Sequence, residues 1–257
     1  MERQKSKPYI AVHGLFKSFG EKDVLKGVDL EVAEGETMVV LGGSGSGKSV
    51  LLRHLNGLVR PDKGEVLIQG TRLNDLEEDE MTDVRKKVAM VFQLGALFDS
   101  MTVYENISYP LDEHTQKSSE EKHRRVRELL SMVELEDDVE QLFPAELSGG
   151  MRKRVALARA LALDPKAVLY DEPTTGLDPL VTSKINQLIR RLQRKLGFTS
   201  IVVTHDLKSA FEVGDRFALI DDGRIRFSGD AKAVKHSNDE LMKEFLRAAL
   251  LPSLNGA

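Results

Sequence analysis

The sequence predicts an α/β fold whose core is a mixed, mainly parallel β-sheet with helices packed on it. Short apolar runs of the kind that form buried strands lie at residues 37–41, 88–92, 167–170, 200–204 and 217–220. Helical stretches separate the later runs, and strands that alternate with helices usually pair in parallel. Between about residues 95 and 160 the helical pattern dominates, so we expect a helical subdomain inserted into the chain there.

The N-terminal part of the chain predicts a different kind of sheet. Residues 9–12 and 28–32 read as short strands, and residues 20–23 between them have turn character. Alternation with a period of two residues, interrupted by turns, is typical of antiparallel pairing. We therefore expect an antiparallel β subdomain ahead of the buried strand at residues 37–41.

One helix of the inserted region can be placed from its first turn. Ser118 is followed three residues later by Glu121, which is the spacing of a capping box. Behind this cap an apolar face with helical spacing is formed by Val126, Leu129, Leu130 and Val133. The charged run at residues 120–127 is then the solvated face of the same helix and not a binding patch.

Composition limits the classes of partner. The chain has 257 residues, 41% of them hydrophobic and 30% charged, which suits one large domain with a full core. Its 37 basic and 41 acidic residues give a net charge of −4, which argues against nucleic acid as a partner because phosphate backbones attract basic surfaces. The absence of cysteine excludes disulfides and thiolate metal sites.

The sequence also predicts where the protein works. It contains no run of ~20 apolar residues that would span a membrane. Residues 1–5 are polar and no apolar signal-peptide core follows them. We expect the chain to stay in the cytoplasm, so any work at a membrane requires another subunit to hold it there.

A glycine-rich loop directly after the strand at 37–41 predicts a phosphate site. It matches G-x-x-x-x-G-K-[ST] and consists of Gly42, Gly43, Ser44, Gly45, Ser46, Gly47, Lys48 and Ser49, with Val50 following in the helix. Backbone N–H groups of such a loop curl around phosphate oxygens, and the helix dipole adds to the attraction. Lys48 is expected to contact the β- and γ-phosphates and Ser49 to bind Mg²⁺. The Rossmann pattern does not fit, because Lys48 stands where its third glycine belongs.

Two further motifs carry chemistry. The apolar strand at 167–170 ends in Asp171 and Glu172, and a parallel strand presents its C-terminal residues at the ligand edge of the sheet. Asp171 is expected to hold Mg²⁺, and Glu172 to polarise the water that attacks the γ-phosphate. Ser148, Gly149 and Gly150 open an arginine-rich helix expected at residues 152–163, and their free N–H groups form a second anion cradle.

These motifs, in this order, resemble the ABC ATPase family over roughly residues 8–235. The resemblance implies the P-loop NTPase fold of that family, with ATP and Mg²⁺ as ligands. It implies that Gln93 binds Mg²⁺ and senses the transporter, and that His205 is the switch histidine. Phe19 resembles the aromatic residue that stacks on adenine, although Phe16 is close enough to compete for this assignment. Residues 147–151 resemble the signature motif, with Met151 where many members have glutamine.

The resemblance also implies an assembly. Two copies would form a head-to-tail homodimer in which the Lys48 loop of one faces the Ser148–Gly149–Gly150 cradle of the other across ATP. We expect residues 8–94 and 161–235 to form the core with its antiparallel part, residues 95–160 the helical subdomain and residues 236–257 a helical tail of the same domain. The apolar spacing of residues 239–250 suits packing either on this domain or on a partner.

Residues 92–107, with 109–115 beyond them, resemble the ATPase subunit of phospholipid transport systems of the Mla/MCE type. This resemblance implies lipid movement between the inner and outer membranes. The implied partners are an integral-membrane permease, an MCE-domain lipid-binding protein and, in some systems, a small STAS-domain protein. The chain would then sit at the cytoplasmic face of the bacterial inner membrane.

Other classes of protein fit less well. A DNA-repair ATPase of the family would carry a long coiled-coil insertion, a translation-type member would carry two cassettes, and a P-loop kinase would lack residues 147–150 and His205. An importer for amino acids or another small solute remains the open alternative. It differs from the lipid transporter only in residues 94–115 and in its partners.

Overall fold

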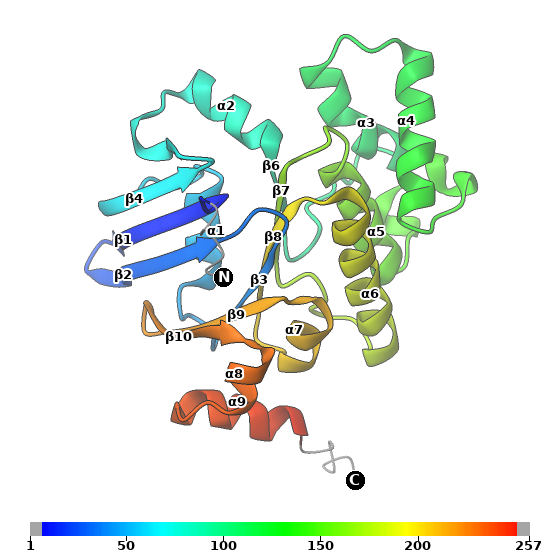
Figure 1. The fold of residues 1–257 in the computed structure, drawn as a ribbon. Coiled ribbons are helices and arrows are strands. Elements are labelled where there is room, and N and C mark those ends of the chain that lie inside the picture. The colour runs from blue at the N-terminus through cyan, green and yellow to red at the C-terminus, as the bar shows by residue number, and fades with distance from the viewer. Residues whose placement is uncertain (1–6, 251–257) are drawn as a thin grey trace, which may run out of the picture.

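The computed structural model describes residues 7–250 and confirms the α/β fold (Figure 1). The central sheet has the strand order β10 (Arg224–Asp230), β9 (Arg216–Asp221), β3 (Thr37–Leu41), β8 (Thr199–Thr204), β7 (Ala167–Asp171) and β6 (Val88–Val91). All neighbours pair in parallel except β10 and β9, which form an antiparallel hairpin. The parallel strands therefore direct their C-terminal ends to one edge, where ligands of such sheets bind.

The predicted antiparallel sheet is also present. Its strand order is β2 (Lys22–Val32), β1 (Ile10–Phe19), β4 (Lys63–Ile68) and β5 (Thr71–Arg72). Strands β1 and β2 are longer than the expected strands at 9–12 and 28–32, and the turn between them lies at Gly20 and Glu21. Register shifts along β1 keep the two strands paired across their irregular middle part.

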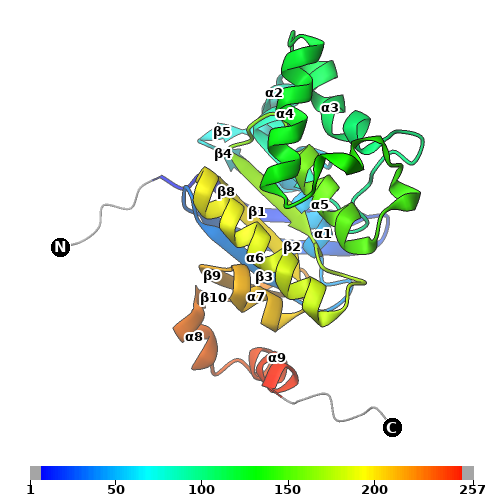
Figure 2. The same ribbon diagram turned by 90° about the vertical axis from the view of Figure 1, so that its right-hand side faces the viewer.

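Helices cover the sheet and extend beyond it. They are α1 (Lys48–Leu55), α2 (Glu78–Lys87), α3 (Val103–His114), α4 (Ser119–Met132), α5 (Gly149–Ala160), α6 (Pro179–Leu196), α7 (Leu207–Val213), α8 (Ala231–Lys235) and α9 (Glu240–Leu250). Helices α3 and α4 lie at one end of the molecule, away from the antiparallel sheet, and α8 and α9 at the other (Figures 1 and 2). Among residues 7–250, no helix is both long and apolar enough to cross a membrane.

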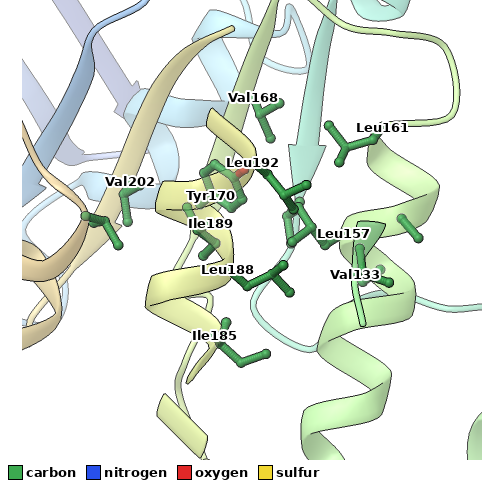
Figure 3. Close-up of a cluster of buried hydrophobic side chains, with 14 of the residues drawn as sticks. Val133, Leu157, Leu161, Val168, Tyr170, Ile185, Leu188, Ile189, Leu192 and Val202 are labelled. Carbon is green, nitrogen blue, oxygen red and sulfur yellow. The ribbon is translucent and has the colours of Figure 1, made fainter. Parts of the chain in front are cut away.

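The two faces of the central sheet bury two different clusters. In β3, Val39 and Leu41 pack with helices α3 to α7, whereas Met38 and Val40 pack with α1 and the antiparallel sheet. Successive side chains of a strand point to opposite faces, so one five-residue strand joins both clusters. On the first face, α6 directs a row of apolar side chains toward α5 and toward β7 and β8 (Figure 3); this row is Ile185, Leu188, Ile189 and Leu192. The second face fixes α1 against β3.

Several local predictions can be compared with the structure. Helix α4 has the capping box, because Ser118 Oγ accepts from Glu121 N and the Glu121 carboxylate accepts from Ser118 N at 2.7 Å. The prediction for α5 was wrong in its bounds, since the helix begins at Gly149 and not at residue 152 and ends at Ala160. The reason is that Ser148 already caps it. Strands β4, β5 and β10 and helix α2 had no counterpart in the expected elements.

The C-terminal segment packs on its own domain, which was one of the two expectations for it. Met242 of α9 is fully buried, and Leu241, Phe245 and Leu246 pack partly buried against the same cluster as helix α7. Arg226 of β10 pairs with Asp239 at 3.3 Å just before α9. The last part of the expected tail, residues 251–257, and the polar start at residues 1–5 lie outside the described residues.

Candidate functional site

The glycine-rich loop connects the end of β3 to the first turn of α1. At Gly42 an added Cβ would lie 2.5 Å from Ile220 O, which is too close for any side chain. Gly47 has φ +104, and a Cβ there would lie 2.8 Å from a methyl carbon of Leu25. Only glycine combines this backbone conformation with such close packing. The loop can therefore bring bare backbone N–H groups to a ligand.

The N-terminus of α1 forms an anion cradle. Within residues 7–250, the N–H groups of Gly45, Gly47, Lys48 and Ser49 donate to no acceptor. Helix α1 has no side-chain cap and no acidic residue in its first turn. Four free donors and the positive end of the helix dipole fit a phosphate group well. A hollow of about 250 Å³ opens at this place and is lined by Lys22, Val24, Gly45, Gly47, Lys48, Ser49 and Val50.

Lys48 lies between the loop and an acidic residue. Its Nζ donates to the carbonyls of Gly42 and Gly43 at 2.8 and 2.9 Å and lies 3.9 Å from Glu172 Oε1. The side chain is almost fully buried, and this burial lowers the pKa of Lys48, while Glu172 and Asp171 act in the opposite direction. Phosphate oxygens would offer the ammonium group stronger partners than two neutral carbonyls.

Ser49 and Asp171 lie in direct contact. Ser49 Oγ donates to Asp171 Oδ1 at 2.8 Å, which joins the first turn of α1 to the end of β7. Burial raises the pKa of Asp171, whereas the hydrogen bond from Ser49 lowers it. A hydroxyl and a carboxylate are ligands that suit Mg²⁺, which keeps few protein ligands and takes the rest from phosphates and water. Among the described residues, no group of three or more acidic or histidine side chains could hold a metal ion by itself.

Glu172 is held in an unusual backbone conformation beside His205. Its φ is +47, and its N–H donates to Val203 O at 3.0 Å. Both carboxylate oxygens lie 3.0 Å from His205 Nδ1, and Oε2 also accepts from Thr175 Oγ1 at 3.3 Å. A left-handed φ is costly for a non-glycine residue and is found where function needs a particular side-chain direction. The carboxylate is thus contacted by His205 and Thr175, and by Lys48 Nζ at 3.9 Å.

Within residues 7–250, Gln93 makes no hydrogen bond to this cluster, and the second cradle lines a separate hollow. Gln93 is exposed on the loop after β6, and its carbonyl accepts from Lys153 Nζ. Ser148 caps α5 by accepting from Met151 N at 3.2 Å. Ser148, Gly149 and Gly150 line a separate hollow of about 520 Å³. This hollow shares no lining residue with the one beside Lys48. One chain therefore brings together Lys48, Ser49, Asp171, Glu172 and His205, but not the second cradle.

The two candidate aromatic residues differ in their surroundings. Phe19 is 50% exposed and pairs across the β1–β2 hairpin with Lys22, which lines the hollow beside Lys48. Lys17 Nζ lies 5.4 Å from the centroid of its ring. The ring of Phe16 instead packs over Gly27, where an added Cβ would lie 3.0 Å from Phe16 Cζ. The placement favours Phe19 as the residue that faces a ligand.

Several neighbours of the site could not be predicted from the sequence. Lys22 and Val24 reach the hollow only because strand β2 passes beside the loop. The contact of Thr175 with Glu172 depends on the turn after β7. The positive φ of Glu172 follows from tertiary packing and has no local sequence signature.

A glycine loop between a buried strand and a helix, with a lysine, a serine and a strand-end acid around it, defines a P-loop nucleotide-binding protein. Comparison with known proteins then identifies the family. Residues 25–175 match the family described as ABC transporter, so the chain belongs to the ABC transporter family as its ATP-hydrolysing subunit.

Curated relatives carry several transport functions. The chain is 42% identical over 237 residues to the probable ribonucleotide transport ATP-binding protein Mkl of Mycobacterium leprae, covering 92% of this chain and 68% of that one. It is 42% identical to the methionine import ATP-binding protein MetN of Carboxydothermus hydrogenoformans, covering 84% and 64%. It is 38% identical to the intermembrane phospholipid transport system ATP-binding protein MlaF of Escherichia coli K12, covering 88% and 84%. The chain thus spans about two thirds of Mkl and of MetN and most of MlaF.

A solved structure agrees with the fold. The ATP-binding cassette MJ0796, described as a dimer in a post-hydrolysis state bound to ADP and Pi, superposes with a TM-score of 0.79 at 38% identity. The match covers 86% of this chain and 98% of that cassette. This likeness and the family match establish the chain as an ATPase that binds ATP.

Proposed function

We propose that this chain works as a homodimer on an integral-membrane permease and powers the movement of phospholipid between two membranes. The observation that carries the membrane partner is the exposed apolar loop after β6. Leu94 is 86% exposed, and Phe98 and Tyr109 beside it are 42% and 38% exposed. The rings of Phe98 and Tyr109 contact each other, with centroids 5.0 Å apart. Large exposed apolar side chains that gather in one place mark a protein contact surface.

A hollow next to this loop supports the same surface. It measures about 470 Å³ and lies between α2, β6, α3 and α5. Its lining includes four side chains that carry or can carry positive charge, Arg85, Lys86, His114 and Arg159, and no acidic side chain. A permease segment with apolar anchors and an acidic residue would complement this surface in shape and charge. Such a segment is the partner that we assign to it.

Within the site, each residue has a proposed role. The N–H groups of the loop from Gly42 to Ser49 and the Lys48 ammonium bind the phosphates of ATP, and Val50 closes the hollow. Phe19 stacks on the adenine ring. Mg²⁺, when bound with ATP, would be held by Ser49, Asp171 and Gln93 and would neutralise phosphate charge. These roles are supported by the free donors of the loop and by the contact of Ser49 with Asp171.

Glu172 is proposed to take a proton from the attacking water, and His205 to orient the Glu172 carboxylate. The 3.0 Å contacts of His205 Nδ1 support this, because an N–H directed at both oxygens fixes the plane of the carboxylate. Glu172 is only slightly exposed, whereas His205 is largely exposed. A partner subunit that covers His205 would also shield the reacting water from solvent.

The dimer is supported by the separation of the two cradles. The hollow at Ser148, Gly149 and Gly150 is open in one chain and offers N–H groups with no ligand residue from its own P-loop. Closing it over a γ-phosphate requires a second chain placed head to tail. The dimer named in the description of MJ0796 is consistent with such an assembly for this chain.

The proposed transported substrate is inferred from resemblance to known transport ATPases. The likeness to MlaF and the loop at residues 92–107 favour phospholipid, with an MCE-domain protein and, in some systems, a STAS-domain protein as further partners. The chain would then lie at the cytoplasmic face of the inner membrane. An importer of a small solute is the second candidate, because the identity to MetN is as high as to any of these relatives.

The test is affinity purification of the tagged chain from gently solubilised membranes. A permease that copurifies with an MCE-domain protein and bound phospholipid would support the lipid function. A permease with a solute-binding protein would replace it by the importer, and the absence of any permease would overturn the membrane partner.

Leu94→Asp tests the docking surface in the same preparation. The change places a charge on the most exposed apolar side chain of the loop, and we expect the permease to be lost from the purified complex. Leu196→Asp is the matched control, since Leu196 is 42% exposed at the end of α6 and lines a hollow that shares no residue with the one beside the loop. Retention of the permease by Leu94→Asp would remove this loop from the interface.

A further inference from the structure

Helix α5 holds the loop after β6 through two cationic side chains. Lys153 Nζ donates to Gln93 O, and Arg159 Nη2 donates to Gly95 O at 2.9 Å. The Arg159 guanidinium also lies 5.6 Å from the centroid of the Phe98 ring. Both cations belong to the helix whose N-terminus is the Ser148–Gly150 cradle. The loop and the cradle are therefore connected through one rigid element.

The loop lies against α5 between these two cations. Gly95 has φ +80, and a Cβ added to it would lie 3.3 Å from the Cβ of Ala156. Lys153, Ala156 and Arg159 follow one another at intervals of three residues, so they are neighbours along one side of the helix. A small residue in the middle lets the backbone of the loop approach, and a cation on either side bonds to a loop carbonyl.

Both cations are partly buried, which makes these contacts costly to break. Desolvation is the main cause that lowers the pKa of Lys153 and of Arg159, so each cation depends on its carbonyl partner in place of water. A partly buried cation that loses its carbonyl partner is no longer compensated for its desolvation. The charge of Glu172 acts on Lys153 in the opposite direction, which places Lys153 within electrostatic range of the proposed base.

We propose that Lys153 and Arg159 are positioning residues that make the loop at residues 93–98 and helix α5 move as one body. The positions of three features relative to one another then stay fixed. These are the permease contact at Leu94, the carbonyl of Gln93 and the Ser148–Gly150 cradle. A push on the loop displaces the cradle that completes the nucleotide site of the second chain. The coupling rests on the proposed permease contact, but the one-body motion does not.

The one-body motion can be tested on the chain alone. Because the sequence contains no cysteine, Leu94→Cys and Arg124→Cys introduce the only two sites for spin labels, one on the loop and one on the exposed side of α4, which packs on α5. We expect a narrow distance distribution in the parent and a broadened one with Lys153→Met or Arg159→Met. Lys153→Arg should restore the narrow distribution, whereas Lys232→Met, a change of an exposed lysine on α8, should not alter it.

The coupling is tested in the assembled transporter. Lys153→Met should lower the ATP hydrolysis rate about tenfold, within the usual range of coupling between sites. The ADP dissociation constant of the isolated chain should stay within about twofold, since Lys153 is outside the P-loop. A distribution as narrow as in the parent for both Met variants would overturn the proposal. So would a rate loss matched by an equal loss of ADP affinity.

The two proposals fail in distinguishable ways. If the loop is not the permease contact, Leu94→Asp retains the permease while the spin-label result is unchanged. If the permease binds but α5 does not hold the loop, the label distribution is the same in all variants. Arg159→Lys keeps the charge but loses the planar guanidinium group. It therefore replaces Arg159→Met in the spin-label experiment if that variant does not fold.

Discussion

The molecule contains two helix N-termini that resemble anion sites, and they differ in what they lack. Helix α1 begins after Gly47 with no side-chain cap, whereas α5 begins after Ser148, whose hydroxyl already accepts from Met151 N. The first end is surrounded by Lys48, Ser49 and Asp171 of the same chain, and the second opens to solvent. The first has unpaired donors without a ligand, so it binds by itself. The second is capped without one, and in the proposed dimer it contacts phosphate only when another chain presents it.

This difference predicts that chemistry and binding respond to different residues. Glu172→Gln should lower ATP hydrolysis in the assembled complex by at least ~10²-fold, the scale of lost general-base catalysis. The amide keeps the shape of the side chain and leaves both anion sites intact, so ATP affinity should not fall. Steady-state rates and ATP calorimetry measure the two quantities. Near-normal turnover would remove Glu172 from the role of base.

At the α1 end, Lys48→Ala should weaken nucleotide binding by the isolated chain. The loss of a charge-assisted contact to phosphate amounts to about 1.5–3 kcal/mol, or roughly 10- to 150-fold in the dissociation constant. Calorimetry with ATP measures it directly. Lys22→Ala is a useful comparison, because Lys22 lines the same hollow without belonging to the loop motif. Unchanged ATP affinity in Lys48→Ala would mean that the free N–H groups bind the phosphates alone.

At the α5 end, Ser148→Ala should have the opposite pattern. We expect unchanged nucleotide affinity in the isolated chain and a hydrolysis rate in the complex that is lower by about tenfold, the value of one hydrogen bond. Loss of the cap would also lower the free energy of unfolding by about 1 kcal/mol. Ser148→Asp separates the two effects, since aspartate also caps helices but repels phosphate. A loss of nucleotide affinity in the isolated Ser148→Ala chain would contradict the division between the two ends.

The two ends also show what the sequence can predict. The α1 end has a local sequence pattern, in which a strand, a glycine loop and a helix follow one another. This pattern was enough to place Lys48 and Ser49 at the start of the helix, where the structure has them. The contact of Ser49 with Asp171 followed from the rule that parallel strands end at one edge. Contacts made through tertiary packing had no such rule. Lys22 lies beside the loop because the distant strand β2 passes there, and Thr175 reaches Glu172 through the conformation of the turn after β7.

Fold prediction failed for a similar reason. Strand β10 has alternating exposed and half-buried residues and lies at the edge of the sheet, so it lacks the apolar run that marked the inner strands. Helix α2 has one buried residue, Met81, and therefore almost no apolar periodicity. Helix α5 was expected three residues too late because Gly149 and Gly150 disfavour helix locally, while the Ser148 cap outweighs that preference.

The smallest expected effect is a change in thermal stability caused by the buried Asp171 carboxyl beside the start of α1. Burial is the main cause that raises the pKa of Asp171 above 3.8, so folding favours the protonated carboxyl. That preference stabilises the folded chain below the unfolded pKa and is lost as the pH rises through the higher folded pKa. Ionisation of the buried carboxylate is therefore disfavoured in the folded chain, and a neutral amide avoids this cost. Asp171→Asn should therefore raise Tm at pH 7 by a few degrees, which corresponds to about 1 kcal/mol in a domain of this size.

The same argument fixes how this gain depends on pH. As the pH falls through the raised pKa toward the unfolded value, the parent carboxyl takes up its proton, so the difference in Tm between Asp171→Asn and the parent should shrink. Scanning calorimetry without nucleotide measures both values, and Asp178→Asn serves as a control at the exposed cap of α6. A lower Tm for Asp171→Asn at pH 7, or a difference that grows on acidification, would show that the hydrogen bond from Ser49 outweighs burial. The α1 end would then be stable without a ligand, as the α5 end is, and the contrast between them would be lost.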